Sequence, residues 1–104
     1  MKIPTQFSMG CHTWKVMIVS KEEMAVRSDS MDGTKSDAPY GLTNSDLCEI
    51  SIRSDVCESL QWHSFWHEFM HVLTGSAGLP KLNNDEDRID LLGLLMAQAQ
   101  QTME

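Results

Sequence analysis

Apolar and polar residues alternate in three stretches of the chain, as is typical of β-strands that bury one face. The first two stretches lie within residues 3–20 and are separated by Gly10. Their apolar positions are Phe7, Met9, Trp14, Val16 and Ile18. Two short strands joined at a glycine predict a β-hairpin. Residues 47–53 alternate again and predict a further strand, with an apolar face of Cys48, Ile50 and Ile52, or the opposite face if the register differs.

The segment between the hairpin and this strand has a weaker pattern. Residues 21–27 are compatible with one short helical turn or more. Residues 28–46 are rich in Ser, Asp, Gly and Thr and contain little that can pack, so we expect a loop there.

The apolar spacing becomes helical from residue 58 to residue 74. The positions that set this period are Leu60, Phe65, Phe69, Val72 and Leu73. A second helix is predicted from near Asn84 to about residue 101, capped by Asn83 or Asn84. Asp85, Glu86 and Asp87 would then favour the positive end of the helix dipole. The apolar face of this helix would be formed by Ile89, Leu91, Leu92, Leu95 and Met96.

These elements predict an α+β fold in one domain, residues 1–104. A small antiparallel sheet, made of the N-terminal hairpin and an edge strand, packs beside the first long helix and the C-terminal helix. The chain of 104 residues, 41% of them apolar, suffices for a single core.

Charge and cysteine content narrow the classes of function. The net charge is −7, with eight Lys and Arg against fifteen Asp and Glu and no basic run. We therefore expect neither nucleic-acid nor membrane binding. The three cysteines include no C-x-x-C pair, and the first residues lack the apolar run of a signal peptide. No stretch reaches the roughly 18 apolar residues of a membrane helix. A soluble, cytoplasmic protein is expected.

One motif carries chemistry. His67, Glu68 and His71 form an H-E-x-x-H sequence inside the first predicted long helix. Residues four apart lie on one face of a helix, so the two imidazoles can bind a single zinc ion. Glu68 is rotated off that face yet close enough to take a proton from a metal-activated water. The motif predicts one zinc per chain and a hydrolytic role for Glu68.

A catalytic zinc site usually has three protein ligands and one open position. Glu86 is the best candidate for the third, since it follows His71 across a loop that lets the next helix fold back. Asp87 and Asp90 are the substitutes. Asp90 can instead orient a histidine through a hydrogen bond. His63 lies one turn before His67 and is interpreted as a residue at the rim of the cleft or simply at the surface.

Most of the chain resembles a family, the small zincin-like metallopeptidases of bacteria and phages, related to the ImmA/IrrE-type and minimal gluzincin proteins. The segments that carry the resemblance are 2–4, 10–16, 40–43, 48–52, 62–71 and 86–92.

The resemblance implies a small antiparallel sheet beside the H-E-x-x-H helix. It implies that an edge strand, for which residues 47–53 are the candidate, lies along the cleft where an extended peptide can add to it. It also implies that the third zinc ligand is a Glu of the second helix, which favours Glu86. A zincin needs a group that stabilises the oxyanion, for which Tyr40, His63 and His12 are the candidates.

The leading hypothesis is a zinc metalloendopeptidase that hydrolyses peptide bonds of a protein substrate, with Glu68 as general base. The alternative is a metal-binding regulatory or protein-interaction module without significant proteolytic activity. A third interpretation is an accidental motif without metal.

Overall fold

The N-terminal hairpin forms one side of the sheet. In the computed structural model, β1 (Gln6–Met9) and β2 (His12–Val19) pair antiparallel. Gly10 and Cys11 between them have φ values of 62° and 67°. This left-handed conformation at both central residues is what a tight two-residue hairpin turn requires. The hairpin prediction is therefore confirmed.

The sheet has four strands and is mixed. The structure describes residues 2–32 and 38–103. Within them, β3 (Gly41–Asn44) and β4 (Glu49–Arg53) extend the hairpin in the order β1-β2-β4-β3. β4 pairs antiparallel with β3 but parallel with β2. The expectation of an antiparallel sheet with residues 47–53 at its edge was therefore wrong, because β4 is an interior strand and β3 is the edge.

The burial of β4 explains its interior position. Ile50 and Ile52 are fully buried on one face, and Ser51 on the other face is buried too. The Ser51 hydroxyl accepts a hydrogen bond from the Arg27 guanidinium of α1 (Lys21–Asp32). A strand covered on both faces fits the middle of a sheet. The parallel pairing is possible because α1 lies in the connection between β2 and β4.

The expected loop at residues 28–46 contains regular structure at both ends. α1 continues to Asp32, and β3 begins at Gly41. Residues 33–37 lie outside the described part of the chain. β3 has only four residues, all half-buried, so its own sequence shows no alternation. Its strand conformation depends on pairing with β4.

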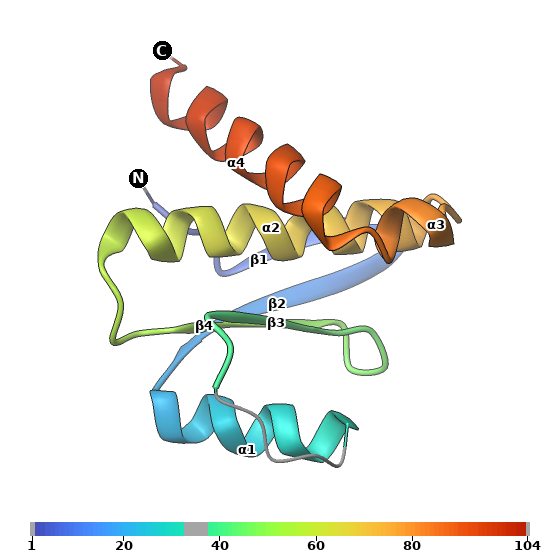
Figure 1. Cartoon of the computed structure of the whole chain (residues 1–104). Coiled ribbons are helices and arrows are strands. Elements are labelled where there is room, and N and C mark those ends of the chain that lie inside the picture. The colour runs from blue at the N-terminus through green and yellow to red at the C-terminus, as the bar shows by residue number, and fades with distance from the viewer. Residues whose placement is uncertain (1, 33–37, 104) are drawn as a thin grey trace.

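The helices form layers on the two faces of the sheet. α1 covers one face, and α2 (Glu58–Ser76) lies across the other (Figure 1). Between α2 and the sheet lies a core of Trp14, Val16, Ile50, Ile52, Phe65 and Val72. The short helix α3 (Pro80–Asn83) and the long helix α4 (Glu86–Thr102) follow. The described residues thus form an α+β fold with four helices.

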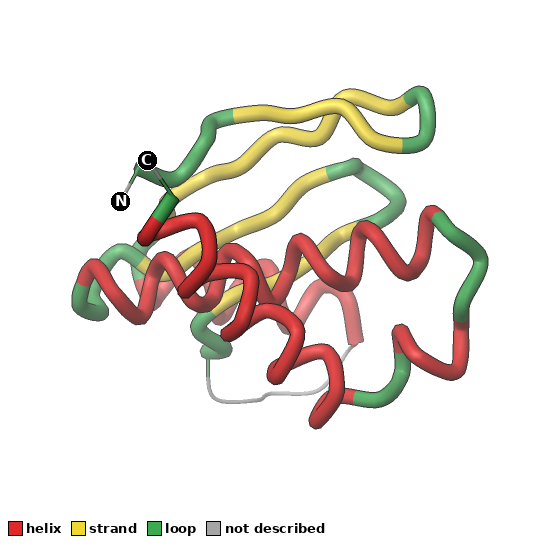
Figure 2. The backbone as a smooth tube through the Cα atoms, turned by 90° about the horizontal axis from the view of Figure 1, so that it is seen from above, coloured by secondary structure: helices red, strands yellow, loops and turns green. Residues whose placement is uncertain are grey.

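α4 crosses α2 obliquely on the side away from the sheet (Figure 2). The residues that α4 buries are Ile89, Gly93 and Ala97. The expected apolar face was only partly right, because Leu91, Leu92 and Leu95 are exposed. Small residues decide the contact: a Cβ on Gly93 would lie 2.7 Å from the Cα of His67. None of the helices in the described residues is long and apolar enough to cross a membrane.

Candidate metal centre

Three side chains from α2 and α4 converge at one point. His67 and His71 project from the same face of α2, with ring centroids 5.2 Å apart. One oxygen of Glu86, Oε2, lies 3.2 Å from His67 Nε2, and the other, Oε1, lies 3.1 Å from His71 Nε2. Each of the three residues offers one ligand atom, and these atoms all lie within 4.8 Å of one another.

The turn between α2 and α4 brings Glu86 to this position. Pro80 begins α3, where its fixed φ suits a first helical turn. Asp85 then caps α4 by accepting a hydrogen bond from the Arg88 backbone N–H at 3.2 Å, so the expected caps Asn83 and Asn84 were wrong. Glu86 is the first residue of α4, and the carboxylate lies where α4 starts back along α2.

Each histidine is oriented by its second ring nitrogen. His67 Nδ1 lies 2.9 Å from Asp90 Oδ1, and His71 Nδ1 lies 2.8 Å from Asn83 Oδ1. Because a carboxylate oxygen and an amide oxygen only accept hydrogen bonds, these contacts place the ring proton on Nδ1. Both Nε2 atoms are then left with a free lone pair on the side of Glu86. Such partners raise the basicity of a ligand and fix its orientation.

Asn83 is itself held in place. The Thr74 hydroxyl lies 3.0 Å from Asn83 Oδ1 and 2.8 Å from the Met70 carbonyl, and its single proton can be donated to either oxygen. The sequence pattern predicted Asn83 only as a helix cap, and no motif marks it as a partner of His71. The contact becomes evident only when α3 is folded against α2.

The donor set suits a zinc ion. Two imidazole nitrogens and one carboxylate oxygen are the ligands of many catalytic zinc sites. Atoms that share a tetrahedral zinc at roughly 2.0–2.1 Å lie about 3.4 Å apart. The contacts of 3.1 Å and 3.2 Å between Glu86 and the two Nε2 atoms are close to that separation. The three residues therefore offer a zinc-type donor set whose ligand atoms all lie within 4.8 Å of one another.

Carboxylates surround His67 and change its pKa. Burial lowers the pKa of the imidazole. The hydrogen bond to Asp90 and the charges of Glu68, Glu86 and Asp90 act in the opposite direction and outweigh burial, so the pKa of His67 is raised. In the absence of a metal, the surrounding carboxylates favour the protonated form of the His67 ring.

Glu68 lies beside the cluster and is buried, with 8% of its surface exposed. Its Oε1 accepts a hydrogen bond of 2.8 Å from the Thr43 hydroxyl, while Oε2 lies 3.9 Å from His67 Nε2. Burial raises the pKa of Glu68. His67, the Thr43 hydrogen bond and His71 lower it by less, and Glu86 adds to the rise. Glu68 is therefore a carboxyl group with a raised pKa at the centre of the site.

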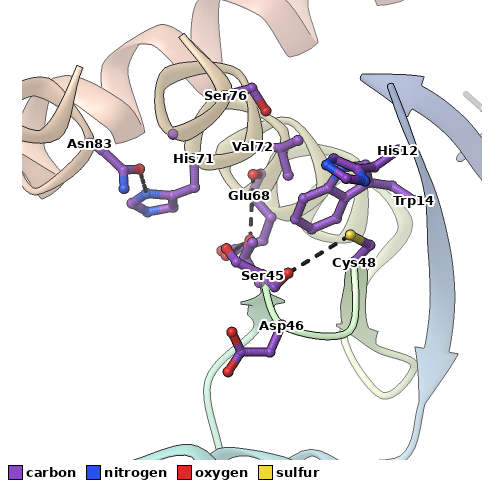
Figure 3. Close-up of a pocket in the computed structure, with 12 residues that line it drawn as sticks. His12, Trp14, Ser45, Asp46, Cys48, Glu68, His71, Val72, Ser76 and Asn83 are labelled. Atoms are coloured by element: carbon purple, nitrogen blue, oxygen red, sulfur yellow. Dashed lines mark hydrogen bonds between the residues drawn. The ribbon is translucent and has the colours of Figure 1, made fainter. Parts of the chain in front are cut away.

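Two cavities meet at Glu68 and His71. The first has a volume of about 650 Å³ and extends toward the β3–β4 turn. Figure 3 looks into it, with His71 and Glu68 on the helical wall and Asp46 opposite. The second, of about 500 Å³, extends past His67 toward Tyr40. No Lys or Arg lines either cavity among the described residues.

The two cavities that meet at Glu68 and His71 are together called the groove. The remaining candidate residues lie around it. Tyr40, His63 and Asp90 line the second cavity, and His12 lines the first. His63 Nε2 lies 3.1 Å from Asp90 Oδ1, so Asp90 contacts two histidines of α2. Of the three proposed third ligands, Glu86 lies between the two Nε2 atoms and Asp90 contacts Nδ1 of His67. Asp87 is not part of the cluster.

Comparison of the chain with protein-family models, with curated proteins and with solved structures finds no match.

Proposed function

We propose that this protein is a zinc-dependent metallopeptidase with a zincin-like site, in which one zinc per chain is held by His67, His71 and Glu86. The observation that carries the proposal is the convergence of these three side chains beside the buried carboxylate of Glu68. When bound, zinc supplies Lewis-acid chemistry by lowering the pKa of a water and polarising a carbonyl.

Glu68 acts as general base in this proposal. Its Oε1 is engaged by Thr43, and its Oε2 lies on the His67 side of the carboxylate. Oε2 accepts the proton of the attacking water and then delivers it to the leaving amine. A raised pKa supports this role, because a base is most effective when its pKa is near the working pH.

The substrate is a peptide or protein segment in extended form. β3 pairs with β4 on one side only, and Thr43 on β3 contacts the base directly. An extended chain that adds to β3 crosses the groove between the two cavities. Tyr40 and His63, both in the second cavity, are the groups available to stabilise the oxyanion. The three free cysteines suit work in the cytoplasm.

The geometry favours an open site over a metal-binding module whose site is closed by a side chain. A closed site needs a further carboxylate at the fourth position. Asp90 contacts Nδ1 of His67, which is not the nitrogen that faces Glu86. Asp90 therefore supports the ring and would not be a metal ligand on the side of Glu86.

The test is a Glu68→Gln substitution in zinc-loaded protein, with cleavage of a mixture of unfolded proteins followed by mass spectrometry. The Glu58→Gln variant, altered at an exposed position of the same helix, is the control. We expect wild type and control to cleave, and Glu68→Gln to lose about 10²–10⁴-fold in rate while it keeps zinc. Cleavage by Glu68→Gln at the wild-type rate would refute the mechanism.

A further inference from the structure

We propose that Thr43 is a positioning residue that holds Glu68 with Oε2 turned toward the metal ligands. This inference rests on the proposed function and adds to it a residue outside the H-E-x-x-H motif. It assigns to the edge strand β3 the task of orienting the base, in addition to any contact with substrate.

The contacts single out one oxygen of the carboxylate. The Thr43 hydroxyl lies 2.8 Å from Glu68 Oε1 and 3.4 Å from the Glu68 backbone carbonyl. A hydroxyl has one proton, and a carboxylate is the stronger acceptor, so the proton is donated to Oε1. Oε2 receives no such bond and lies on the side of His67 Nε2. The two oxygens of Glu68 thus have different environments, and Thr43 creates the difference.

The local structure keeps this arrangement from rotating. Thr43 is β-branched and lies in a paired strand opposite Ile50, which restricts its own side chain. Gly41, two residues before it on β3, approaches Glu68 so closely that a Cβ there would lie 2.9 Å from Glu68 Cγ. β3 therefore confines the stem of Glu68 at Gly41 and binds its carboxylate at Thr43.

A base that is held in position gains rate because the reacting geometry exists before the substrate arrives. A displacement of about 1 Å at such a group can cost on the order of a hundredfold in rate. A threonine that merely satisfies a buried acceptor has a different signature. Its removal lowers stability, but it does not change the turnover number separately from substrate affinity.

The experiment compares Thr43→Val, which keeps the shape but lacks the hydroxyl, with Thr43→Ser, which keeps the hydroxyl. Thr13→Val, at an exposed strand position on β2, is the control. All variants are zinc-loaded. Three quantities are measured: zinc content, kcat and KM on a peptide found in the cleavage screen, and the affinity of acetohydroxamate. This small zinc ligand loses a proton that Glu68 can accept.

We expect Thr43→Val to bind zinc like the wild type, to lose about 10–100-fold in kcat with KM within about twofold, and to bind acetohydroxamate more weakly. Thr43→Ser should restore both kcat and affinity, and Thr13→Val should change neither. Wild-type kcat and hydroxamate affinity in Thr43→Val would overturn the inference and leave the peptidase proposal intact.

The Thr43 inference can also be tested if the peptidase proposal fails. A wild-type protein that binds zinc but cleaves nothing would contradict the peptidase proposal. In that case hydroxamate affinity decides on Thr43: weaker binding in Thr43→Val that Thr43→Ser restores supports the positioning role, and unchanged binding overturns it.

Discussion

The two walls of the groove hold different parts of the site. On the helical wall, α2, α3 and α4 bring together His67, His71 and Glu86, with Asp90 and Asn83 behind the rings. On the strand wall, β3 touches Glu68 through Gly41 and Thr43. In the proposed function, metal binding and orientation of the base are therefore assigned to separate elements. Substitutions of the proposed metal ligands and of their hydrogen-bond partners on the helical wall should change zinc affinity, and those on the strand wall should change catalysis alone.

The largest effect on the helical wall is expected from Glu86→Ala. Glu86 lies within 3.2 Å of both Nε2 atoms, so its removal leaves the metal with two protein ligands. Zinc affinity should fall by more than the ~10–100-fold that is typical of losing a partner of a ligand. Titration with a competing fluorescent chelator measures the change. The neighbouring variant Asp87→Ala is the control, and an equal loss in both would remove Glu86 from the ligand set.

A smaller loss is expected from Asp90→Ala. Asp90 Oδ1 accepts from His67 Nδ1 at 2.9 Å and so fixes which nitrogen carries the proton. Zinc affinity should fall by about 10–100-fold, and Asp90→Asn should recover part of it because an amide oxygen also accepts. The same chelator titration applies. Unchanged affinity in Asp90→Ala would mean that the ring needs no such support.

On the strand wall, Gly41→Ala should separate catalysis from metal binding. The added Cβ meets the buried side chain of Glu68, at 2.9 Å from Cγ and 3.0 Å from Oε2. The carboxylate must shift, while no backbone is displaced. We expect zinc affinity close to wild type, a lower Tm because a buried side chain must shift, and a fall in kcat of roughly tenfold or more. A parallel loss of zinc would show that the two walls are not independent.

The smallest expected effect is the pH dependence of stabilisation by zinc. The pKa of His67 in the metal-free fold is raised above its unfolded value of about 6.5. Its charge therefore stabilises the metal-free fold fully below about pH 6.5, and this contribution is lost as pH rises through the folded pKa. Zinc binds only the neutral ring. The increase in Tm on adding zinc should grow as pH rises above about 6.5, and a constant or falling increase would contradict competition between a proton and zinc at His67.

The helical wall could be inferred from sequence far better than the strand wall. The spacing of His67 and His71 places them on one helical face. Apart from Glu104, Glu86 is the only Glu that follows them, so the sequence favours it as the third ligand. β3 gave no such signal, because four half-buried residues show no alternation and their conformation comes from pairing with β4. Without β3, neither the edge of the sheet nor the role of Thr43 could be derived.

The same reasoning explains the wrong edge strand. Cys48, Ile50 and Ile52 alternate with polar residues, which predicts one buried face and one exposed face. Ser51 is buried nonetheless, because α1 covers the second face and supplies Arg27 as its partner. A pattern that counts only apolar positions cannot predict that a short polar residue is buried beneath a helix. The contact between Asn83 and His71 could not be predicted for a similar reason, since the two residues lie on different helices.

The most direct test of the account is the metal content of the protein. It would be purified without a histidine tag, supplied with zinc, and measured by elemental analysis beside a His67→Ala, His71→Ala double variant. The account predicts about one zinc per wild-type chain and none retained by the variant. A wild-type protein that holds no zinc after it is supplied, or a variant that holds as much as the wild type, would contradict the claim that His67, His71 and Glu86 form a metal centre.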